Sequence, residues 1–403
     1  MSEDITGDSV SSKYKWYILT LAALTHTIAV AIPHMAMPVL FDEISKDLGL
    51  NLVQVGWVWG ISALTGILTG LVGGTLGDRF GTKRVLAVSC ILGGMTCALR
   101  GLSSDYVSLI VTSLLYGLVP AGIPMNVHKV CGIWFPGRLG FANGIVSAGM
   151  ALGFMLGSAL SASVLSPWLG GWRQVLYLYG AISIIVGILW SFTQASPVSV
   201  DAQAHHESKV SLKKGIPYVA RVRNIWFVGL AMLGISACIG GTLGYLPLYL
   251  RRIGWPEIGA DAALATFHGI SLIAAIPIAL LSDRLGSRRK MVMAATLMIA
   301  AGIGLLSFST GSLVWVGVCI AGVVRDGFMA ILMTMIIEVK AIGAKYAGTA
   351  IGFVMIFSRT GNLISPPLGN SLAEYNPAIP FIFWAVLALM GLLGFYFFKE
   401  ERK

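Results

Sequence analysis

The chain has 403 residues, of which 56% are hydrophobic and only 11% are charged. Soluble globular domains carry about 25% charged residues, so this composition excludes a soluble globule and predicts a membrane protein. The formal net charge is +10 at pH 7. A nucleic-acid partner is not expected, because the basic residues gather in short segments between apolar stretches, as membrane insertion favours.

Apolar segments of about 20 residues, the length that spans a bilayer, recur along the whole chain. Twelve such segments lie at 14–44, 52–77, 85–102, 106–131, 139–165, 173–195, 224–250, 259–282, 290–310, 313–338, 346–371 and 378–398. The sequence therefore predicts an all-α membrane protein whose twelve transmembrane helices form two pseudo-symmetric bundles of six.

The longest polar stretch between these segments lies in the middle of the chain. It predicts a cytoplasmic linker at 196–223, between an N-terminal bundle at 1–195 and a C-terminal bundle at 224–403. The linker contains the adjacent pair His205 and His206. A neighbouring pair on a loop is typical of solvated side chains, and no three ligand residues share a metal-binding spacing. We expect neither a metal nor a cofactor.

Lysines and arginines are distributed unevenly between the two sides of the predicted membrane. Both ends of the chain, the linker and the loops near residues 80 and 287 are rich in them, whereas the opposite loops hold few. Cytoplasmic loops carry the excess of basic residues. The pattern predicts a multi-pass protein of the inner or plasma membrane with both termini in the cytoplasm.

A short charged segment occurs twice, each time after the second apolar segment of a half. The first copy, at 74–84, reads GTLGDRFGTKR, and the second, at 279–289, reads ALLSDRLGSRR. Their aspartates, Asp78 and Asp283, are 283 − 78 = 205 positions apart. A glycine pair in the fourth apolar segment, at 117 and 122, recurs at 322 and 327 with the same offset. The chain is therefore predicted to consist of two similar halves, as transporters built from repeats are.

The first charged segment resembles the loop motif of the major facilitator superfamily, and the second copy, the twelve segments and the central linker agree with it. The resemblance covers essentially the whole chain and implies alternating access with a cytoplasmic latch between the halves. Its implied gating residues are Gly74, Asp78, Arg79, Gly81, Lys83 and Arg84, with Asp283, Arg284, Gly286 and Arg288 in the second copy. The second copy departs from the motif in having Ala279 in place of the first glycine.

Glycines spaced four apart predict faces where helix backbones approach closely. They are Gly66, Gly70 and Gly74 in the second segment and Gly149, Gly153 and Gly157 in the fifth.

Charged residues at membrane depth are the candidates for substrate contact, because a charge there is costly and faces a cavity or a partner. Arg325 and Asp326 lie halfway along the tenth segment, and Arg359 halfway along the eleventh. We expect one arginine to pair with Asp326 and the other, preferably Arg359, to remain available for an anion. Asn362 and His34 complete the predicted substrate-binding set.

Three residues are candidates for proton coupling: Asp326, His26 and His268. Histidine titrates near physiological pH, although an intramembrane histidine is more often a packing residue. His26 and His34 are eight residues apart, which on an α-helix places them on roughly one face.

The resulting hypothesis is a monomeric, proton- or anion-coupled carrier of a small anion, preferably a carboxylate, with that solute and the lipid bilayer as its partners. The segment at 134–144 resembles the connection between helices 4 and 5 in organic-anion and nitrate carriers. The alternatives are an exporter of a hydrophobic or cationic compound that depends on Asp326, and a transporter-like sensor. No nucleotide loop or nucleophile–base arrangement stands out, so an enzyme is not expected.

Overall fold

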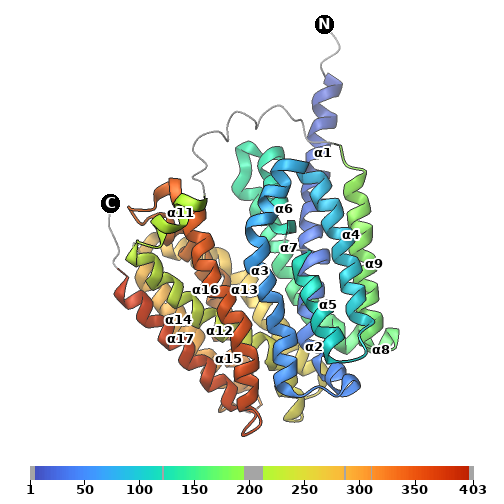
Figure 1. Ribbon diagram of the computed structural model, residues 1–403, viewed down its shortest axis with the longest axis vertical. Coiled ribbons are helices and arrows are strands. Elements are labelled where there is room, and N and C mark those ends of the chain that lie inside the picture. The colour runs from blue at the N-terminus through green and yellow to red at the C-terminus, as the bar shows by residue number, and fades with distance from the viewer. Residues whose placement is uncertain (1–4, 120–121, 195–211, 286, 310, 399–403) are drawn as a thin grey trace. The chain divides into compact units, whose positions relative to one another are not determined.

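The computed structural model describes the chain except residues 1–4, 120–121, 195–211, 286, 310 and 399–403. All regular elements in the described residues are helices (Figure 1). In chain order they are α1 (Ile5–Leu24), the π-helix η1 (Thr25–Ala31), α2 (Ile32–Leu48), α3 (Leu52–Phe80), α4 (Thr82–Gly101), α5 (Tyr106–Leu118), α6 (Ile123–Trp134), the 3₁₀-helix η3 (Pro136–Arg138), α7 (Leu139–Leu160), the π-helix η4 (Ser161–Leu165), α8 (Ser166–Leu169), α9 (Trp172–Ser191), α11 (Leu212–Val219), α12 (Arg223–Arg252), α13 (Glu257–Leu285), α14 (Arg288–Leu306), α15 (Leu313–Ile337), α16 (Gly343–Leu372) and α17 (Ile379–Phe397).

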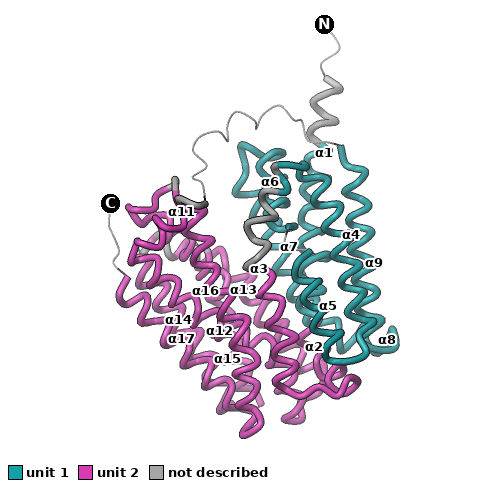
Figure 2. Tube along the Cα trace, in the orientation of Figure 1, with its two compact units in different colours: residues 1–36, 68–198 teal, residues 37–67, 199–403 magenta. Residues whose placement is uncertain are grey.

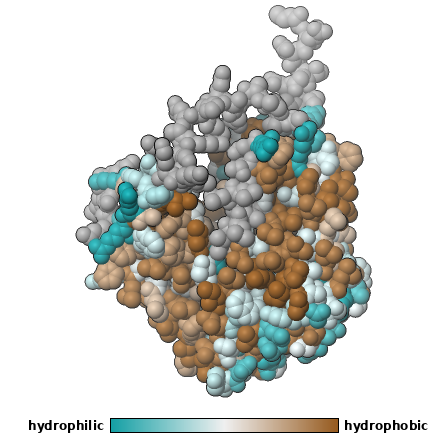
Figure 3. All heavy atoms as spheres, viewed as in Figure 1, coloured by the Kyte–Doolittle hydropathy of each residue, from teal (hydrophilic) through white to brown (hydrophobic). Residues whose placement is uncertain are grey.

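The all-α membrane fold expected from the sequence is confirmed. Ten stretches of the described chain are helices long and apolar enough to cross a membrane, and Leu52–Gly66 is a shorter apolar helix. Large apolar side chains such as Ile273 and Ile276 on α13 are exposed, and hydrophobic residues cover much of the face seen in Figure 3. Such a surface is stable in lipid, where it needs no polar cover.

Three of the predicted segments are not single α-helices, and one of them, expected at 139–165, is α7 followed by the π-helical turn η4. The first consists of α1, the π-helical turn η1 and α2. The fourth, expected as one helix at 106–131, is two helices, since α5 ends at Leu118 and α6 begins at Ile123. Pro124 lies in the first turn of α6, where its missing N–H costs nothing.

Contacts divide the chain into two compact units (Figure 2). Unit 1 comprises Met1–Ala36 and Leu68–Val198, and unit 2 comprises Met37–Ile67 and Ser199–Lys403. In unit 1, α4 packs along α9, and α7 packs against η1. In unit 2, α12 packs against α16 and α17, and α13 packs against α15. The domain boundaries predicted at 195 and 224 remain a prediction.

The close approach expected at the glycines of the fifth segment is present in unit 1. A Cβ atom added to Gly153 would lie 2.6 Å from the Ala31 Cβ, and one added to Gly157 would lie 2.7 Å from the Ile32 carbonyl oxygen. At Gly149 the Thr27 hydroxyl donates a 2.8 Å hydrogen bond to the glycine carbonyl. Helix α7 therefore needs these three glycines to pack against residues 27–32. Gly70 and Gly74 lie outside the side-chain positions that the structure describes.

Helix α5 begins at a capping box. The Asp105 carboxylate accepts a 2.9 Å hydrogen bond from the Ser108 N–H, and the Ser108 hydroxyl accepts one of 3.1 Å from the Asp105 N–H. The bond from the Ser108 backbone lowers the pKa of the Asp105 carboxyl from its ordinary value. Two N–H groups without helical acceptors are thereby satisfied outside the apolar span.

Candidate functional site

Helix α15 has a compact charged cluster at its middle. Arg325 Nη1 donates to Asp326 Oδ1 at 3.0 Å and lies 3.4 Å from His268 Nδ1 on α13. The Asp326 N–H donates to the Ser271 hydroxyl at 3.1 Å. The arginine's positive charge is therefore balanced within its own helix, and α13 supplies further polar partners. The structure brings Arg325, a candidate for substrate binding, together with Asp326 and His268, two candidates for proton coupling.

Arg359 on α16 has different surroundings. Ser358 just before it is buried and shares a 2.7 Å hydrogen bond with Ser236 on α12. The Gly361 backbone also touches α12, since an added Cβ would lie 2.4 Å from the Leu233 carbonyl oxygen. Consecutive residues of an α-helix point about 100° apart. Arg359 consequently lies beside the α12-facing side of the helix, and its side chain is exposed.

The guanidinium of Arg359 lies against α3. A Cβ added to Gly66 would lie 3.0 Å from both Cζ and Nε of the arginine. No ion pair joins Arg359 to a carboxylate among the residues whose side chains are described. In this part of the chain Arg325 pairs with Asp326, and the availability of Arg359 for an anion remains a prediction.

Asn362, the predicted polar neighbour of Arg359, lies on the backbone of α12. A Cβ added to Gly240 would be 2.1 Å from Asn362 Oδ1. The carbonyl group of Gly240 accepts a 2.8 Å hydrogen bond from Trp59 Nε1 of α3. Asn362 thus lies in the packing between α16 and α12, and its expected role in substrate binding remains a prediction.

The predicted histidines of unit 1 lie in two aromatic contacts. His26 belongs to η1, is buried, and packs edge-to-face on His128 with ring centroids 5.5 Å apart. His128 Nδ1 lies 2.9 Å from Asn143 Oδ1. His34, on α2, lies 6.2 Å from the Phe154 ring. The angular count that put His26 and His34 on one face assumed an unbroken α-helix. The intervening π-helical turn is wider, so that count does not apply across it.

Each charged loop connects two helices. In the first, α3 ends at Phe80 and α4 begins at Thr82, with Gly81 between them at φ +83°. That left-handed conformation favours glycine. Lys83 donates to the Thr193 carbonyl oxygen, while Arg79 and Arg84 are exposed.

In the second copy, α13 ends at Leu285 and α14 begins at Arg288. Arg288 forms a 2.8 Å ion pair with Glu338, and Arg284 is exposed. The side chains of Asp78 and Asp283, the surroundings of Gly74 and the whole of Gly286 fall outside what the structure describes. Their gating roles therefore stay a prediction.

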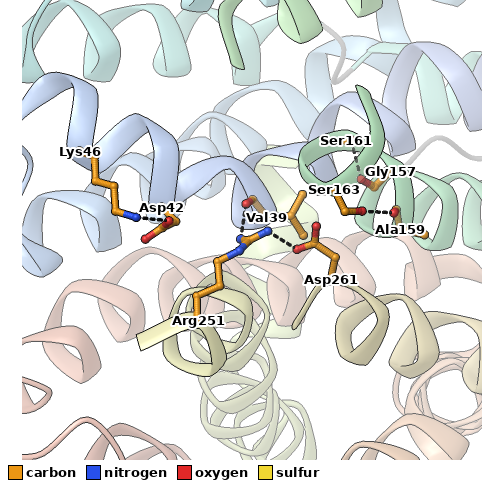
Figure 4. A network of polar contacts seen from close by, with 9 residues as sticks. All are labelled: Val39, Asp42, Lys46, Gly157, Ala159, Ser161, Ser163, Arg251 and Asp261. Atoms are coloured by element: carbon orange, nitrogen blue, oxygen red, sulfur yellow. Dashed lines mark hydrogen bonds and ion pairs between the residues drawn. The ribbon is translucent and has the colours of Figure 1, made fainter. Parts of the chain in front are cut away.

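The sequence reasoning missed one buried ion pair in unit 2. Arg251 at the end of α12 donates to Asp261 Oδ1 on α13 at 2.6 Å and to the Val39 carbonyl oxygen on α2 at 2.5 Å (Figure 4). The Asp261 side chain is fully buried. The available signal was an aspartate three residues inside the predicted span at 259–282, ten residues after an arginine.

Comparisons with known proteins agree with this architecture. Residues 19–359 match the family described as Major Facilitator Superfamily. A bacterial homologue of the human lysosomal transporter Spinster has a similar solved structure, with a TM-score of 0.78 at 15% identity over 95% of this chain and 96% of that chain. The nucleoside transporter NupG has a TM-score of 0.77 at 13% identity, over 94% and 98% of the two chains.

Curated relatives extend the likeness along the sequence. The probable sulfoacetate transporter SauU of Cupriavidus necator is 24% identical over 96% of this chain and 94% of its own. The probable nitrate/nitrite antiporter NarK1 of Thermus thermophilus is 26% identical over 94% and 89%. The hexuronate transporter of Bacillus subtilis is 21% identical over 84% and 83%. With the doubled charged loop and the helical membrane fold, the match over residues 19–359 shows that this chain belongs to the Major Facilitator Superfamily and is a transporter, not an enzyme.

Proposed function

We propose that the protein is a secondary active transporter that moves a small anion, preferably a carboxylate, across the membrane by alternating access. The observation that carries this proposal is Arg359. Arg359 lies in the middle of α16, is an exposed residue, and has no ion pair with any carboxylate among the described side chains.

An arginine at membrane depth without a fixed counter-charge is costly, and a bound anion would offset that cost. The planar guanidinium donates two parallel hydrogen bonds to a carboxylate, which adds directional specificity to the charge attraction. The named solutes of the relatives, sulfoacetate, nitrate or nitrite and hexuronate, are all anions. Their shared charge supports an anionic substrate for this chain.

We further propose that transport is coupled to a proton or a second anion. Asp326 and His268 both lie near Arg325 Nη1 and offer two titratable groups at one place. His26, in contact with His128, offers another in unit 1. If Asp326 carries the proton, Asp326→Asn should remove acceleration of uptake by an inward proton gradient while leaving exchange of labelled substrate intact. A retained gradient response would assign coupling elsewhere.

We propose that the doubled loop acts as the cytoplasmic latch. We also propose that the chain is a monomer in the plasma membrane or inner membrane, with both termini in the cytoplasm. The excess of basic residues in the linker and at both ends supports that orientation. Reporter fusions at either terminus test it: a reporter that folds only in the cytoplasm should be active at both ends. Activity at one end alone would contradict the topology.

The principal experiment is uptake into liposomes containing the purified protein, with sulfoacetate, glucuronate and nitrate as labelled probes. Arg359→Gln should reduce uptake of the preferred anion by roughly 30-fold to several thousand-fold, because truncating one member of a desolvated charge pair costs about 2–5 kcal/mol. The matched control is Arg252→Gln, which removes an exposed arginine at the end of α12. Normal uptake by the Arg359→Gln protein would remove the main support for an anion.

The second candidate function is export of a hydrophobic or cationic compound through Asp326. That carboxylate is already paired with Arg325 at 3.0 Å, which disfavours it as a cation site. An Asp326→Asn variant that loses efflux of a cationic dye while Arg359→Gln retains it would favour the exporter over the anion carrier.

A further inference from the structure

Helices α3 and α16 are in contact, and the distance between them changes along their length. At one end, a Cβ added to Gly56 would lie 2.6 Å from the Pro367 Cα, and one added to Gly60 would lie 2.5 Å from the Leu363 carbonyl oxygen. The position on α16 decreases as that on α3 increases, so the two helices run antiparallel. Over this stretch backbone rests on backbone, and no side chain fits between them.

The spacing differs at Gly66. The three atoms nearest an added Cβ are the Cζ and Nε of Arg359, both at 3.0 Å, and its Cδ, at 3.3 Å. All three belong to the side chain, whereas the close atoms at Gly56 and Gly60 belong to the backbone. The helices have therefore separated by the thickness of one side chain, and the inner part of the guanidinium fills that space. The two Nη atoms lie farther from Gly66 than these three atoms.

We propose that Gly66 is a positioning residue for the anion site: because it has no side chain, the Cδ–Nε–Cζ part of Arg359 lies against α3 and the Nη edge is presented to the substrate. This inference rests on the proposed function of Arg359. Support along one side limits the orientations of a long side chain before the anion arrives. The remaining Nη edge is the part of a guanidinium that holds a carboxylate in bidentate fashion.

The consequence of a side chain at position 66 follows from the distances. A methyl group 3.0 Å from Cζ and Nε is too close, so the guanidinium must move by a few tenths of an ångström. The neighbour is the flexible end of a side chain, so the helices themselves need not shift. Binding geometry that must hold within about 0.5 Å is sensitive to such a displacement.

The experiment uses the probe anion that the unmodified protein takes up fastest. Gly66→Ala should raise the KM for that anion about tenfold, since a displacement of about 1 Å costs on the order of 100-fold. The maximal rate should stay within about twofold, because alternation of the helices is unaffected, and Gly66→Val should raise the KM further. The matched control is Gly352→Ala on α16, where an added Cβ meets nothing within 4 Å.

Repeating Gly66→Ala in an Arg359→Lys variant distinguishes a role in positioning the arginine from a role in helix packing. In Arg359→Lys, whose narrow ammonium end has no planar group to displace, adding Gly66→Ala should change neither the KM nor the Kd measured from anion-induced thermal stabilisation. An equal loss from Gly66→Ala in both backgrounds would overturn the inference, as would an unchanged KM in the arginine background. Failure of Gly66→Ala to fold in the lysine background would also overturn it, because helix packing would then require the glycine.

Failure of the inference is distinguishable from failure of the proposed function. If Arg359→Gln loses uptake but Gly66→Ala keeps the KM of the unmodified protein, only the positioning role is wrong. If Arg359→Gln transports normally, the anion site itself is wrong, and any effect of Gly66→Ala then reports helix packing.

Discussion

Two arginines lie near the middle of α15 and α16, and they differ in whether a carboxylate is paired with them. Arg325 has an adjacent carboxylate at 3.0 Å and a histidine at 3.4 Å. Arg359 lies on the backbone of Gly66 and has no ion pair among the described side chains. An arginine at membrane depth can thus have its counter-charge within the protein, as Arg325 does. An arginine paired within the protein leaves no charge uncompensated, whereas an arginine without a counter-charge can bind an anionic solute that supplies one.

We expect the largest effect when Arg359 is given the neighbour that Arg325 has. Thr360 occupies the position on α16 that Asp326 occupies on α15, directly after the arginine. Thr360→Asp should lower uptake of the preferred anion by about 10- to 150-fold, because a hydrogen bond between charged groups is worth about 1.5–3 kcal/mol and the new carboxylate competes with the solute. Initial uptake rates in liposomes measure the effect.

The control for this variant is Thr360→Asn, which has nearly the same shape and no charge. It also loses the hydrogen bond from the Thr360 hydroxyl to the Ile356 carbonyl oxygen, at 2.9 Å, so it reports the cost of that loss alone. Equal uptake by the two variants would contradict an electrostatic role for Arg359.

The converse change removes the counter-charge from Arg325. Asp326→Asn should lower the free energy of unfolding by about 1–2 kcal/mol, between the values for exposed and fully buried ion pairs, because both side chains are only partly exposed. The double variant Arg325→Gln/Asp326→Asn should recover most of that loss, since it leaves no uncompensated charge. Denaturation in detergent micelles, followed by the fluorescence of the tryptophans, measures both. The single variant Arg325→Gln completes the set. If the double variant loses more free energy of unfolding than Asp326→Asn and Arg325→Gln lose together, the pair is not structural.

The fold was largely predictable because its determinants are local and repeated. Apolar segments of spanning length and the offset of 205 between Asp78 and Asp283 needed no tertiary information. The same offset superposes Gly117 on Gly322, yet α5 ends one residue after the first of these glycines, while α15 continues past the second. Sequence symmetry therefore predicted the equivalent positions but not the break in one of the two helices.

The candidate site was predictable only in part. Depth along a helix follows from counting residues, so Arg325 and Arg359 were identified from the sequence. The sequence also indicated that one of them pairs with Asp326, but the support that Gly66 gives Arg359 depends on how far apart α3 and α16 lie. Likewise, the contact between His26 and His128 depends on a π-helical turn for which the sequence has no periodic signal.

The smallest expected effect concerns how α3 is held near Arg359. Trp59 Nε1 donates a buried 2.8 Å hydrogen bond to the Gly240 carbonyl oxygen, and the ring rests on the backbone of Gly244. Trp59→Phe removes the donor and keeps an aromatic ring, so the free energy of unfolding should fall by about 1 kcal/mol, the net value of one such bond. The KM for the anion should rise by less than about threefold, because backbone contacts at Gly56 and Gly60 still hold α3 against α16. A rise as large as that from Gly66→Ala would show that the hydrogen bond, and not the glycine contacts, determines where α3 meets the arginine.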